Sequence, residues 1–593
     1  MMRKSPSLHL LCVGRGTLPT FKFSFTLFET TPRRILLFAF FSLFLCVSFS
    51  LFSSHNSIYA NHLSVNYSSL PPIHPTRLAS SSFQDFIFIH TQSVLLPDWQ
   101  VLVIVSPETD SQLLSCGNFI CVYPNNATAP ATFSGILPST NQTTFKCLLP
   151  RSTRRRLPFA APILSDKESP VPWLYSPPQQ ELIRWTYLVY ESFSTEDDVV
   201  LFVKGLNNRQ GLNRSPREFK CVFFVEEANN DSGTVKTTVT SSIQEVFRCG
   251  HPDLTAFGSI DEHDHDHNPI KLKLSVEETT ATGAKKVVPS VAYYTPRRKR
   301  AKSQPKSLLC ASTMVYNVGK FLREWIMYHS KIGVEKFILY DNDSDDDLIS
   351  IVKNLNEEGY NVETLLWLWP KTQEAGFSHA ALYAKDSCKW MIYIDIDEFI
   401  FAPSWDNSSQ PSDQMLKSLL PPSSTSRRHM IGEVWIMCNE FGPSNQRSHP
   451  AEGVIQGYTC RRRLENRHKS IVLLEAIDDS LLNVIHHFSL NKCYRMKQLS
   501  LEVAVVNHYK YQAWAEFKAK FRRRVSAYVV DWMSSLNPLS KDRTPGLGYE
   551  AVEPRGWENK FCEVRDDRLK MLTRRWFGKQ MGSRGTYRMA WQS

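Results

Sequence analysis

The sequence predicts an α/β protein in three parts: an N-terminal transmembrane helix, a β-sandwich-like domain, and a C-terminal domain built on a parallel sheet. Three observations predict this architecture. An apolar run fills residues 35–52, short strand-like runs fill residues 85–255, and strands alternate with amphipathic helices from residue 307 onward. A chain of 593 residues is also too long for one hydrophobic core, so at least two folded domains are expected.

The apolar run at residues 35–52 is just long enough to span a bilayer. Residues 1–34 carry six basic residues and a single acid, Glu29, whereas residues 55–69 are uncharged apart from histidine. The positive-inside rule therefore predicts a cytosolic tail at residues 1–34 and a lumenal location for the rest. A cleaved signal peptide is the alternative, but the leader is long and no clear small-x-small site follows the run.

The segment after the anchor is predicted to be a stem followed by a β-rich domain. Residues 53–84 are rich in Ser, Pro and Asn, which is typical of a flexible stem. In residues 85–255, alternating or β-branched runs are separated by turn-forming residues, which predicts an antiparallel sandwich. Five glycosylation sequons, a poorer one at Asn213 before Pro216 and one inside an acidic motif at Asn342 favour an oxidising, lumenal compartment, as do scattered cysteines without a CxxC pair. Some cysteines are still expected as buried free thiols, Cys388 above all.

Residues 256–306 are predicted to be a linker. They contain a His/Asp run at residues 261–267, for which a solvated acidic loop is favoured over a zinc site, and a basic tetrad at residues 297–300. The net charge of +11 is spread along the chain rather than gathered in one stripe, so the composition gives no indication of nucleic-acid binding.

From residue 307 the hydrophobic pattern alternates between strand and helix periods. Strands are expected at residues 307–315, 336–340, 362–369 and 391–396, with helices between them at residues 318–332, 345–358 and 375–389. This order predicts a parallel sheet with helices on both faces and ligands at the carboxyl ends of the strands. Two acidic motifs, at residues 341–345 and at Asp395/Asp397, fall at or near such ends.

Asp395 and Asp397 lie in an otherwise apolar run, residues 391–401. Because alternate residues of a strand point to the same face, the two carboxylates are expected to converge. Two like charges in a weakly solvated place repel each other and lose hydration, unless a cation lies between them or one takes up a proton. Mg²⁺ and Mn²⁺ prefer carboxylates and are often shared with nucleotide phosphates, so the pair predicts an enzyme that acts on a metal–diphosphate substrate.

Three ordered blocks stand out in this half of the chain: residues 310–347, 391–401 and 507–521. Together they resemble glycosyltransferase family 92, also called the DUF23 domain, whose best-known plant members are galactan synthases. The resemblance covers about residues 307–545 and leaves residues 546–593 as a C-terminal extension. It implies a GT-A fold, a Rossmann-like sheet that binds a nucleotide sugar and Mn²⁺, in a type II membrane protein of the Golgi apparatus.

The resemblance also implies roles for individual residues. Asp395 and Asp397 match the metal-binding DxD motif, and His508 resembles the histidine that completes the metal or diphosphate site. Four further side chains are expected to contact the nucleotide sugar: Asn317, Asp341, Asp343 and Lys469. Helix capping is the alternative for the two aspartates of this set, and a solvated surface position is the alternative for the lysine.

Transfer with inversion needs a general base near the acceptor hydroxyl. Glu440 is the candidate, because it follows the strand-like residues 433–437 in the region where GT-A enzymes carry that base. Asp478 and Asp479 are rivals. The two histidines at residues 486–487 lie in an apolar segment, where core histidines are the default.

The sequence therefore predicts a single-pass type II Golgi glycoprotein that moves a hexose from a UDP-sugar to a cell-wall or glycoprotein glycan, with Mn²⁺ and inversion. Galactose is the favoured sugar. The expected partners are the UDP-sugar donor, the glycan acceptor and the membrane, with a homodimer allowed and no nucleic acid. The alternatives are a catalytically inactive, membrane-anchored glycan-binding protein and a metal-dependent hydrolase of nucleotide sugars.

Overall fold

A computed structural model describes residues 89–107, 109, 118–155, 157–173, 180–207, 213–225, 233–257, 272–280, 282–296, 305–422, 430–520, 553–581 and 586–592. All of them belong to one compact unit, Phe86–Ser593. The predicted tail, anchor and stem lie outside the described residues, as do the His/Asp run and the basic tetrad. Within the described part of the chain, no helix has the length and apolar character needed to cross a bilayer.

The first β module contains two sheets that share one hydrophobic core. The larger has the order β5-β6-β2-β1-β8 and the smaller the order β4-β3-β7. A disulfide, Cys121–Cys147, joins a strand of one sheet to a strand of the other. The strands are β1 Thr91–Leu95, β2 Gln100–Val105, β3 Phe119–Val122, β4 Thr128–Pro130, β5 Thr132–Ile136, β6 Thr143–Leu148, β7 Ile163–Asp166 and β8 Ile183–Arg184.

The second β module is a single eight-stranded sheet with the order β15-β14-β11-β12-β13-β10-β9, in which β16 also pairs with β14. The disulfide Cys221–Cys249 joins β11 to β13 inside its core. The strands are β9 Leu188–Ser194, β10 Val199–Lys204, β11 Phe219–Val225, β12 Thr234–Ile243, β13 Val246–Cys249, β14 Leu272–Thr279, β15 Lys285–Val287 and β16 Tyr293–Tyr294.

These modules correct two predictions. Residues 85–255 do not form one sandwich, because their strands divide between the two modules. Residues 256–306 are not simply a linker, because β14 pairs with β11 along its length and completes the second sheet. Leu272, Leu274 and Val276 alternate with polar residues, which is the period of a strand, but the Lys- and Thr-rich composition of this stretch had favoured a linker.

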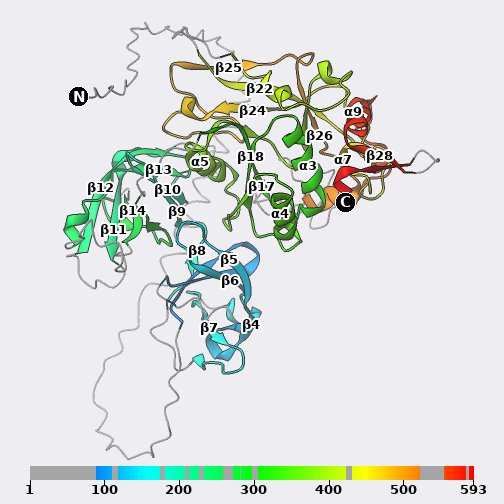
Figure 1. Ribbon diagram of the computed structural model, residues 1–593. Coiled ribbons are helices and arrows are strands. Elements are labelled where there is room, and N and C mark those ends of the chain that lie inside the picture. Colours follow the sequence, from blue (N-terminus) through cyan, green and yellow to red (C-terminus); the bar gives the residue numbers. More distant parts are fainter. Residues whose placement is uncertain are drawn as a thin grey trace, which may run out of the picture. The chain divides into compact units, whose positions relative to one another are not determined.

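The C-terminal domain is mixed α/β, and its first half confirms the predicted alternation. Four parallel strands stand in the order β19-β18-β17-β20, and Figure 1 shows helices α3, α4 and α5 beside them. Their bounds are β17 Ser307–Val315, α3 Gly319–Lys331, β18 Lys336–Asp341, α4 Leu348–Glu357, β19 Val362–Leu366, α5 Gln373–Ala384 and β20 Cys388–Tyr393.

The same sheet continues past β20 through antiparallel and mixed pairs, in the order β20-β24-β22-β26-β21, with β25 beside β22. In the predicted C-terminal extension, the described residues 553–581 are tied to this domain by a disulfide, Cys460–Cys562. The further elements are β21 Glu398–Phe401, α6 Gln414–Lys417, β22 Met430–Glu440, α7 Val454–Gly457, β23 Cys460–Arg461, β24 His468–Leu473, β25 Tyr494–Gln498, β26 Val505–His508, β27 Val564–Arg565, α9 Arg568–Phe577, β28 Gly578–Met581 and β29 Thr586–Met589.

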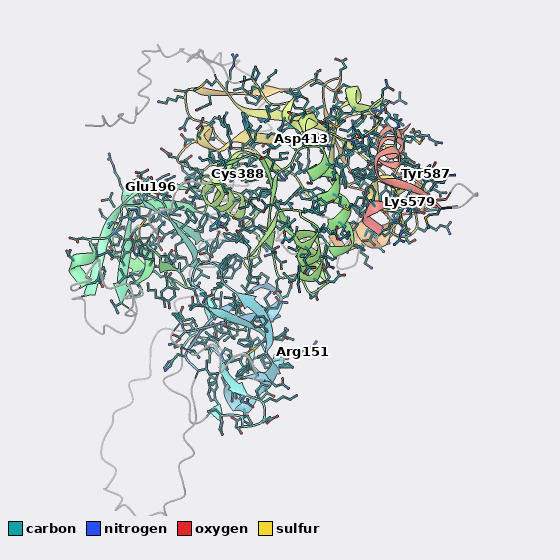
Figure 2. All side chains as sticks on the ribbon, viewed as in Figure 1. Arg151, Glu196, Cys388, Asp413, Lys579 and Tyr587 are labelled. Carbon is teal, nitrogen blue, oxygen red and sulfur yellow. A yellow bond between two sulfur atoms is a disulfide. The ribbon has the colours of Figure 1, made fainter. Side chains whose placement is uncertain are left out.

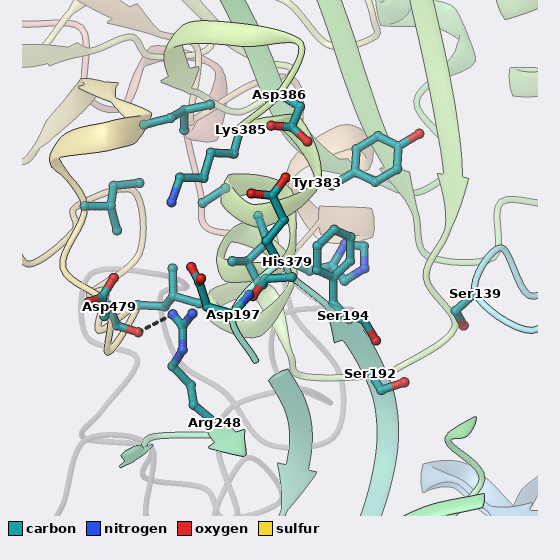
Figure 3. A pocket seen from close by; sticks show the side chains of 18 of the residues that line it. Ser139, Ser192, Ser194, Asp197, Arg248, His379, Tyr383, Lys385, Asp386 and Asp479 are labelled. Carbon is teal, nitrogen blue, oxygen red and sulfur yellow. Dashed lines mark hydrogen bonds between the residues drawn. The ribbon is translucent and has the colours of Figure 1, made fainter. Parts of the chain in front are cut away.

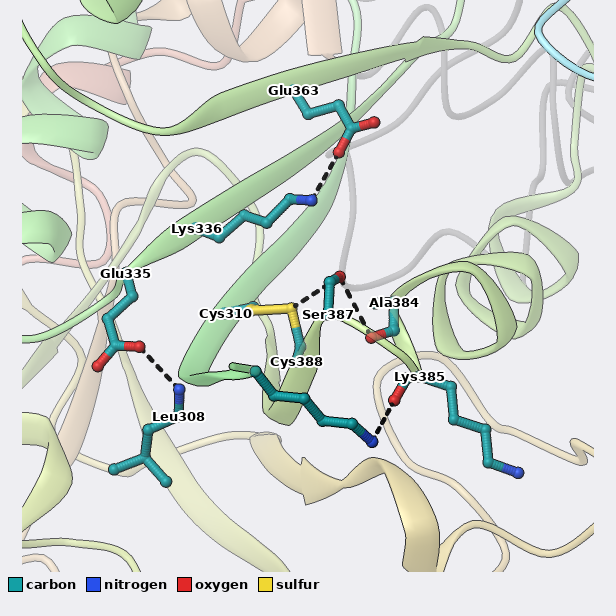
Figure 4. Close-up of a disulfide and its surroundings, with 10 residues drawn as sticks. Leu308, Cys310, Glu335, Lys336, Glu363, Ala384, Lys385, Ser387 and Cys388 are labelled. Carbon is teal, nitrogen blue, oxygen red and sulfur yellow. Dashed lines mark hydrogen bonds and ion pairs between the residues drawn. A yellow bond between two sulfur atoms is a disulfide. The ribbon is translucent and has the colours of Figure 1, made fainter. Parts of the chain in front are cut away.

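Cys388 is not a free thiol, as the sequence had suggested. It begins β20 and forms a disulfide with Cys310 of the neighbouring strand β17 (Figure 4). The helix predicted at residues 375–389 ends at Ala384, so Cys388 faces a strand partner instead of lying on a helix. Among the described residues the free cysteine is Cys438, which is buried.

The β modules are packed against the α/β domain rather than tethered to it. Trp185 is 3% exposed and stacks on Trp369, with ring centroids 5.8 Å apart. Tyr190 and Phe202 of the second module contact Trp367 of the α/β domain. Trp185 therefore belongs to a core that the β modules and the α/β domain share.

Candidate active site

Asp395 and Asp397 lie in the turn between β20 and β21, not inside a strand. The strand predicted to reach Ile396 ends at Tyr393, because the chain must leave the middle of the sheet for β21 at its far end. The turn is held locally by the Asp395 N–H, which donates to Glu398 Oε2 at 2.8 Å. Both carboxylates still follow the carboxyl end of the fourth parallel strand, as predicted.

Asp395 is paired with a buried lysine. Lys469 Nζ, on the neighbouring strand β24, lies 2.8 Å from Asp395 Oδ2 and 2.8 Å from Glu398 Oε2. Burial favours the neutral amine, but the two carboxylates outweigh it and raise the pKa of Lys469. Burial lowers the pKa of His486 to about 4, so this histidine is neutral and accepts a 2.7 Å hydrogen bond from Lys469 Nζ. The surface alternative for Lys469 was wrong, since this residue is only 5% exposed.

Asp397 faces His508 and a second lysine. Its Oδ2 lies 2.8 Å from Lys520 Nζ and 3.6 Å from His508 Nε2. Burial alone would raise the pKa of Asp397, yet Lys520 and His508 hold it well below its usual range. His508 stands on β26 directly opposite Glu398 of β21, and its Nδ1 lies 3.4 Å from Glu398 Oε1.

The predicted metal ligands are brought together only in part. Among the described residues, no three His, Cys, Asp or Glu side chains are grouped closely enough to hold a metal. Asp397 Oδ2 and His508 Nε2 nevertheless fit a hard divalent cation, because both are buried donors of the right type and the histidine nitrogen has no hydrogen-bond partner among the described residues. Asp395 is engaged by Lys469 instead.

The predicted nucleotide contacts Asn317, Asp341 and Asp343 gather where β17 and β18 end side by side. Asp341 Oδ1 accepts hydrogen bonds from the N–H and the hydroxyl of Ser344, at 3.0 and 2.7 Å. The N–H of Asn317 donates to the same hydroxyl at 3.0 Å, so the two strand ends are joined. Asp343 pairs with Lys146 of strand β6, which brings the first β module to the edge of this site.

Helix capping does not explain Asp341 or Asp343. A different acid contacts the start of the helix that follows them, since Asp346 Oδ1 accepts the N–H of Leu348 at the start of α4 at 3.3 Å. Its Oδ2 also accepts the N–H of Gly319 at the start of α3 at 2.8 Å. Asn317 and Asp343 both have left-handed backbones, with φ of 49° and 70°, a conformation that Asn and Asp tolerate better than most residues. Asp341 and Asp343 therefore belong to the end of β18 and the loop after it, and do not cap a helix.

Glu440, the predicted base, ends strand β22 opposite His508. Its side chain is 0% exposed, and its oxygens face Lys510 Nζ at 2.6 Å and Arg462 Nη1 at 3.2 Å. Burial opposes ionisation, but these cations lower the pKa of Glu440 below its usual range. The carboxylate is thus ionised beside the site and enclosed by cations, and its role as a base stays a prediction.

The rival bases Asp478 and Asp479 lie elsewhere. They line a cavity of about 480 Å³ shared with α5 and the second β module (Figure 3). In this view Arg248 reaches the carbonyl oxygen of Asp479, at 2.7 Å. Asp478 and Asp479 follow the last residue of β24, which pairs near the start of β20. The Asp395–Asp397 turn follows the opposite end of β20, so the two rivals lie at the other edge of the sheet.

Comparison with known proteins identifies the chain. Residues 306–542 match glycosyltransferase family 92. A family 92 protein of Ricinus communis is 38% identical over 86% of this chain and 86% of its own length. The chain belongs to glycosyltransferase family 92. A family 92 protein of Arabidopsis thaliana is 43% identical over 67% of this chain and 68% of its own.

The family 92 protein is accordingly a glycosyltransferase. Among solved structures, a mannosyltransferase from Pyrobaculum calidifontis in complex with GDP-Man and Mn²⁺ aligns at a TM-score of 0.23 and 10% identity, over 39% of this chain and 66% of that chain. That likeness is too weak to bear on the fold or on the metal.

Sequence reasoning missed three residues of the family 92 site: Glu398, His486 and Lys520. Glu398 directly follows the Asp395–Asp397 motif, so its place in the buried cluster had a local signal. Lys520 lay inside the third family block, and nothing in its spacing indicated the ion pair with Asp397, 123 residues away. His486 had been assigned to the core and is buried, but it also touches the site lysine.

Proposed function

We propose that this glycosyltransferase has a GT-A catalytic domain and moves a hexose, galactose in the first instance, from a UDP-sugar to a glycan acceptor with inversion, using Mn²⁺. One observation carries the proposal: the buried Asp397 of the Asp395–Asp397 turn meets His508 just beyond the carboxyl end of β20, where a nucleotide-binding α/β sheet holds its ligand. The strand ends at Asn317 and Asp341 lie on the same edge of the sheet.

In this proposal Asp397 and His508 hold the metal, and Asp395 joins them when Lys469 turns toward the diphosphate. When bound, the metal supplies positive charge to the leaving diphosphate. Asn317, Asp341 and Asp343 then contact the nucleoside. Lys520 would have to leave Asp397, because a dication and an ammonium group repel each other when they share one carboxylate.

Glu440 is proposed as the group that takes the proton from the acceptor hydroxyl. Its low pKa keeps it ionised, and it stands one strand beyond His508. To act, it must exchange the ammonium of Lys510 for the acceptor hydroxyl.

We also propose a lumenal site of action, in the Golgi membrane, with residues 35–52 as a single type II anchor. Besides the N-terminal charge pattern, the pairing of Cys121–Cys147, Cys221–Cys249, Cys310–Cys388 and Cys460–Cys562 supports an oxidising compartment.

The test uses the purified full-length protein, Mn²⁺, glycan acceptors and a panel of UDP-sugars. We expect one UDP-hexose to give product, and Asp397→Asn to lower the rate by about a hundredfold or more, since it removes a charge that acts on the leaving group through the metal. Asp413→Asn is the matched control, because Asp413 is an exposed acid at the start of α6 (Figure 2).

Two results would contradict the proposal. Transfer that persists unchanged in Asp397→Asn, or in the wild type after removal of divalent metal, would refute the metal assignment. Release of UDP without a glycosylated product would indicate a hydrolase instead.

A further inference from the structure

A cavity of about 510 Å³ lies beside helix α9, apart from the strand ends that form the donor site. It is enclosed by the loop before and through α7, by one side of α9, and by strand β29 near the C-terminus, elements that lie together in Figure 1. Its lining includes two cations of α9, Lys570 and Arg574, and the ring of Tyr587 from β29, together with Glu452 and His449 from the segment before α7.

Lys570 and Arg574 are four residues apart and so lie on the same side of α9. Within the described part of the chain, neither has a carboxylate within 4.0 Å, and Glu452 is the single acid of the lining. The other arginines of the helix are satisfied: Arg568 pairs with Asp566 at 2.6 Å, and Arg575 donates to the carbonyl oxygen of Asp406 at 2.9 Å. Among the described residues that line the cavity, two cationic side chains therefore face a single carboxylate, that of Glu452.

The guanidinium group of Arg574 is held in place. Its Cζ lies 4.9 Å from the ring centroid of Tyr587, and its Nε is buried with no hydrogen-bond partner among the described residues. Burial and the neighbouring arginine lower the pKa of Lys570, as expected for two cations that share a cavity. An anion bound between them would relieve this repulsion.

Side-chain contacts connect the cavity to the Asp395–Asp397 turn. His449 lines the cavity, and its ring meets Phe321 edge-on at 5.0 Å. Lys520 Nζ lies 5.7 Å from the centroid of the same Phe321 ring and 2.8 Å from Asp397. The wall of the cavity is thus linked to Asp397 through the buried ring of Phe321 and through Lys520.

We propose that this cavity is an acceptor subsite that binds a carboxylate of an acidic glycan, a chain containing uronic acid residues. This inference rests on the proposed function, because it names the acceptor class of the same transferase site. A guanidinium and an ammonium group bind carboxylates through charge-assisted hydrogen bonds, and the ring of Tyr587 offers a flat face beside them for a sugar ring. The other source of negative charge, the donor diphosphate, belongs to the ends of β17, β18 and β20 rather than to α9.

The test measures equilibrium binding to the purified full-length protein, without any transfer step. The probes are a fluorescent oligosaccharide of galacturonic acid and a neutral galactose oligosaccharide of equal length. We expect the acidic probe to bind more tightly, and to weaken at high salt. The double variant Lys570→Ala/Arg574→Ala should lower its affinity by about tenfold or more. Lys579→Ala on the exposed strand β28 is the matched control (Figure 2), and should bind like the wild type.

Conservative replacement separates charge from folding. Lys570→Arg/Arg574→Lys keeps both charges and should retain preference for the acidic probe, while the melting temperature of each variant checks that it folds. The inference is overturned if the two probes bind equally, if neither binds, or if the alanine variant binds the acidic probe like the wild type. It is also overturned if UDP displaces the acidic probe from the α9 cavity, since the cavity would then belong to the donor.

Failure of the proposed function gives a different result. Selective, variant-sensitive binding of the acidic probe without transfer of any sugar would refute the proposed reaction and leave the anionic subsite intact. Transfer to neutral glycans alone, with no binding of the acidic probe, would refute the subsite and leave the reaction intact.

Discussion

Glu324 makes the stability of this protein depend on pH in a predictable direction. This glutamate of α3 is 3% exposed, and its two oxygens accept the N–H groups of Val454 and Ile455, at 2.7 and 2.9 Å, where α7 begins. Burial raises its pKa from 4.5 to about 8, although these hydrogen bonds oppose the rise. Gly453 allows the close approach, because a Cβ there would lie 2.6 Å from Glu324 Oε2.

The sign follows from the two pKa values. Below pH 4.5 the carboxyl group is protonated in both the folded and the unfolded chain, and its contribution to stability is fully present. Between pH 4.5 and about 8 only the unfolded chain releases the proton, so the free energy of unfolding falls as the pH rises. At about 1.4 kcal/mol for each unit of difference, the total loss is about 5 kcal/mol.

Glu324→Gln removes this titration and keeps one carbonyl oxygen to accept one of the two N–H groups, while its NH2 group cannot accept the other. At pH 4.5 we expect the free energy of unfolding of the variant to be no higher than that of the wild type. From pH 4.5 to pH 8 the difference should shift steadily in favour of the variant. Differential scanning calorimetry of both proteins across this range measures the difference, and hydrogen exchange of the Val454 and Ile455 amides reports the local contact. A difference in melting temperature that stays constant from pH 4.5 to pH 8 would refute the reasoning.

Two further predictions concern the buried lysine and the contact between domains. Lys469→Met should destabilise the fold by about 3–5 kcal/mol, because it leaves the buried carboxylate of Glu398, and the part-buried one of Asp395, without their cation. Thermal unfolding should show the loss, and a Lys469→Arg variant that melts no higher than the methionine variant would argue against charge as the cause. Trp185→Ala should lower the free energy of unfolding by about 3–5 kcal/mol, because it leaves a cavity in the core shared with Trp369. It should also speed limited proteolysis between the domains. A melting temperature and a cleavage rate equal to those of the wild type would contradict this prediction.

The predicted alternation of strands and helices was correct over β17 to β20 because each element shows its own hydrophobic period within about ten residues. The same reasoning failed at β14, where a regular strand period was overlooked in a Lys- and Thr-rich stretch, and at Cys388, where a helix was extended into a strand. It also placed Asp395 and Asp397 in a strand, but it correctly predicted that they lie near the carboxyl end of the fourth parallel strand. Local patterns therefore located the elements better than their ends.

The sequence by itself determined the family, the parallel half of the sheet and the acidic turn at Asp395–Asp397, since these depend on neighbours along the chain. Only the tertiary structure decided which partners surround that turn. Lys469, His508 and Lys520 reach it from segments 74 to 123 residues away, through strand pairings or an ion pair that no local period encodes. These side chains change the ionisation of the carboxyl groups at the turn, because burial and nearby cations together set the pKa of Asp397 and of Glu398.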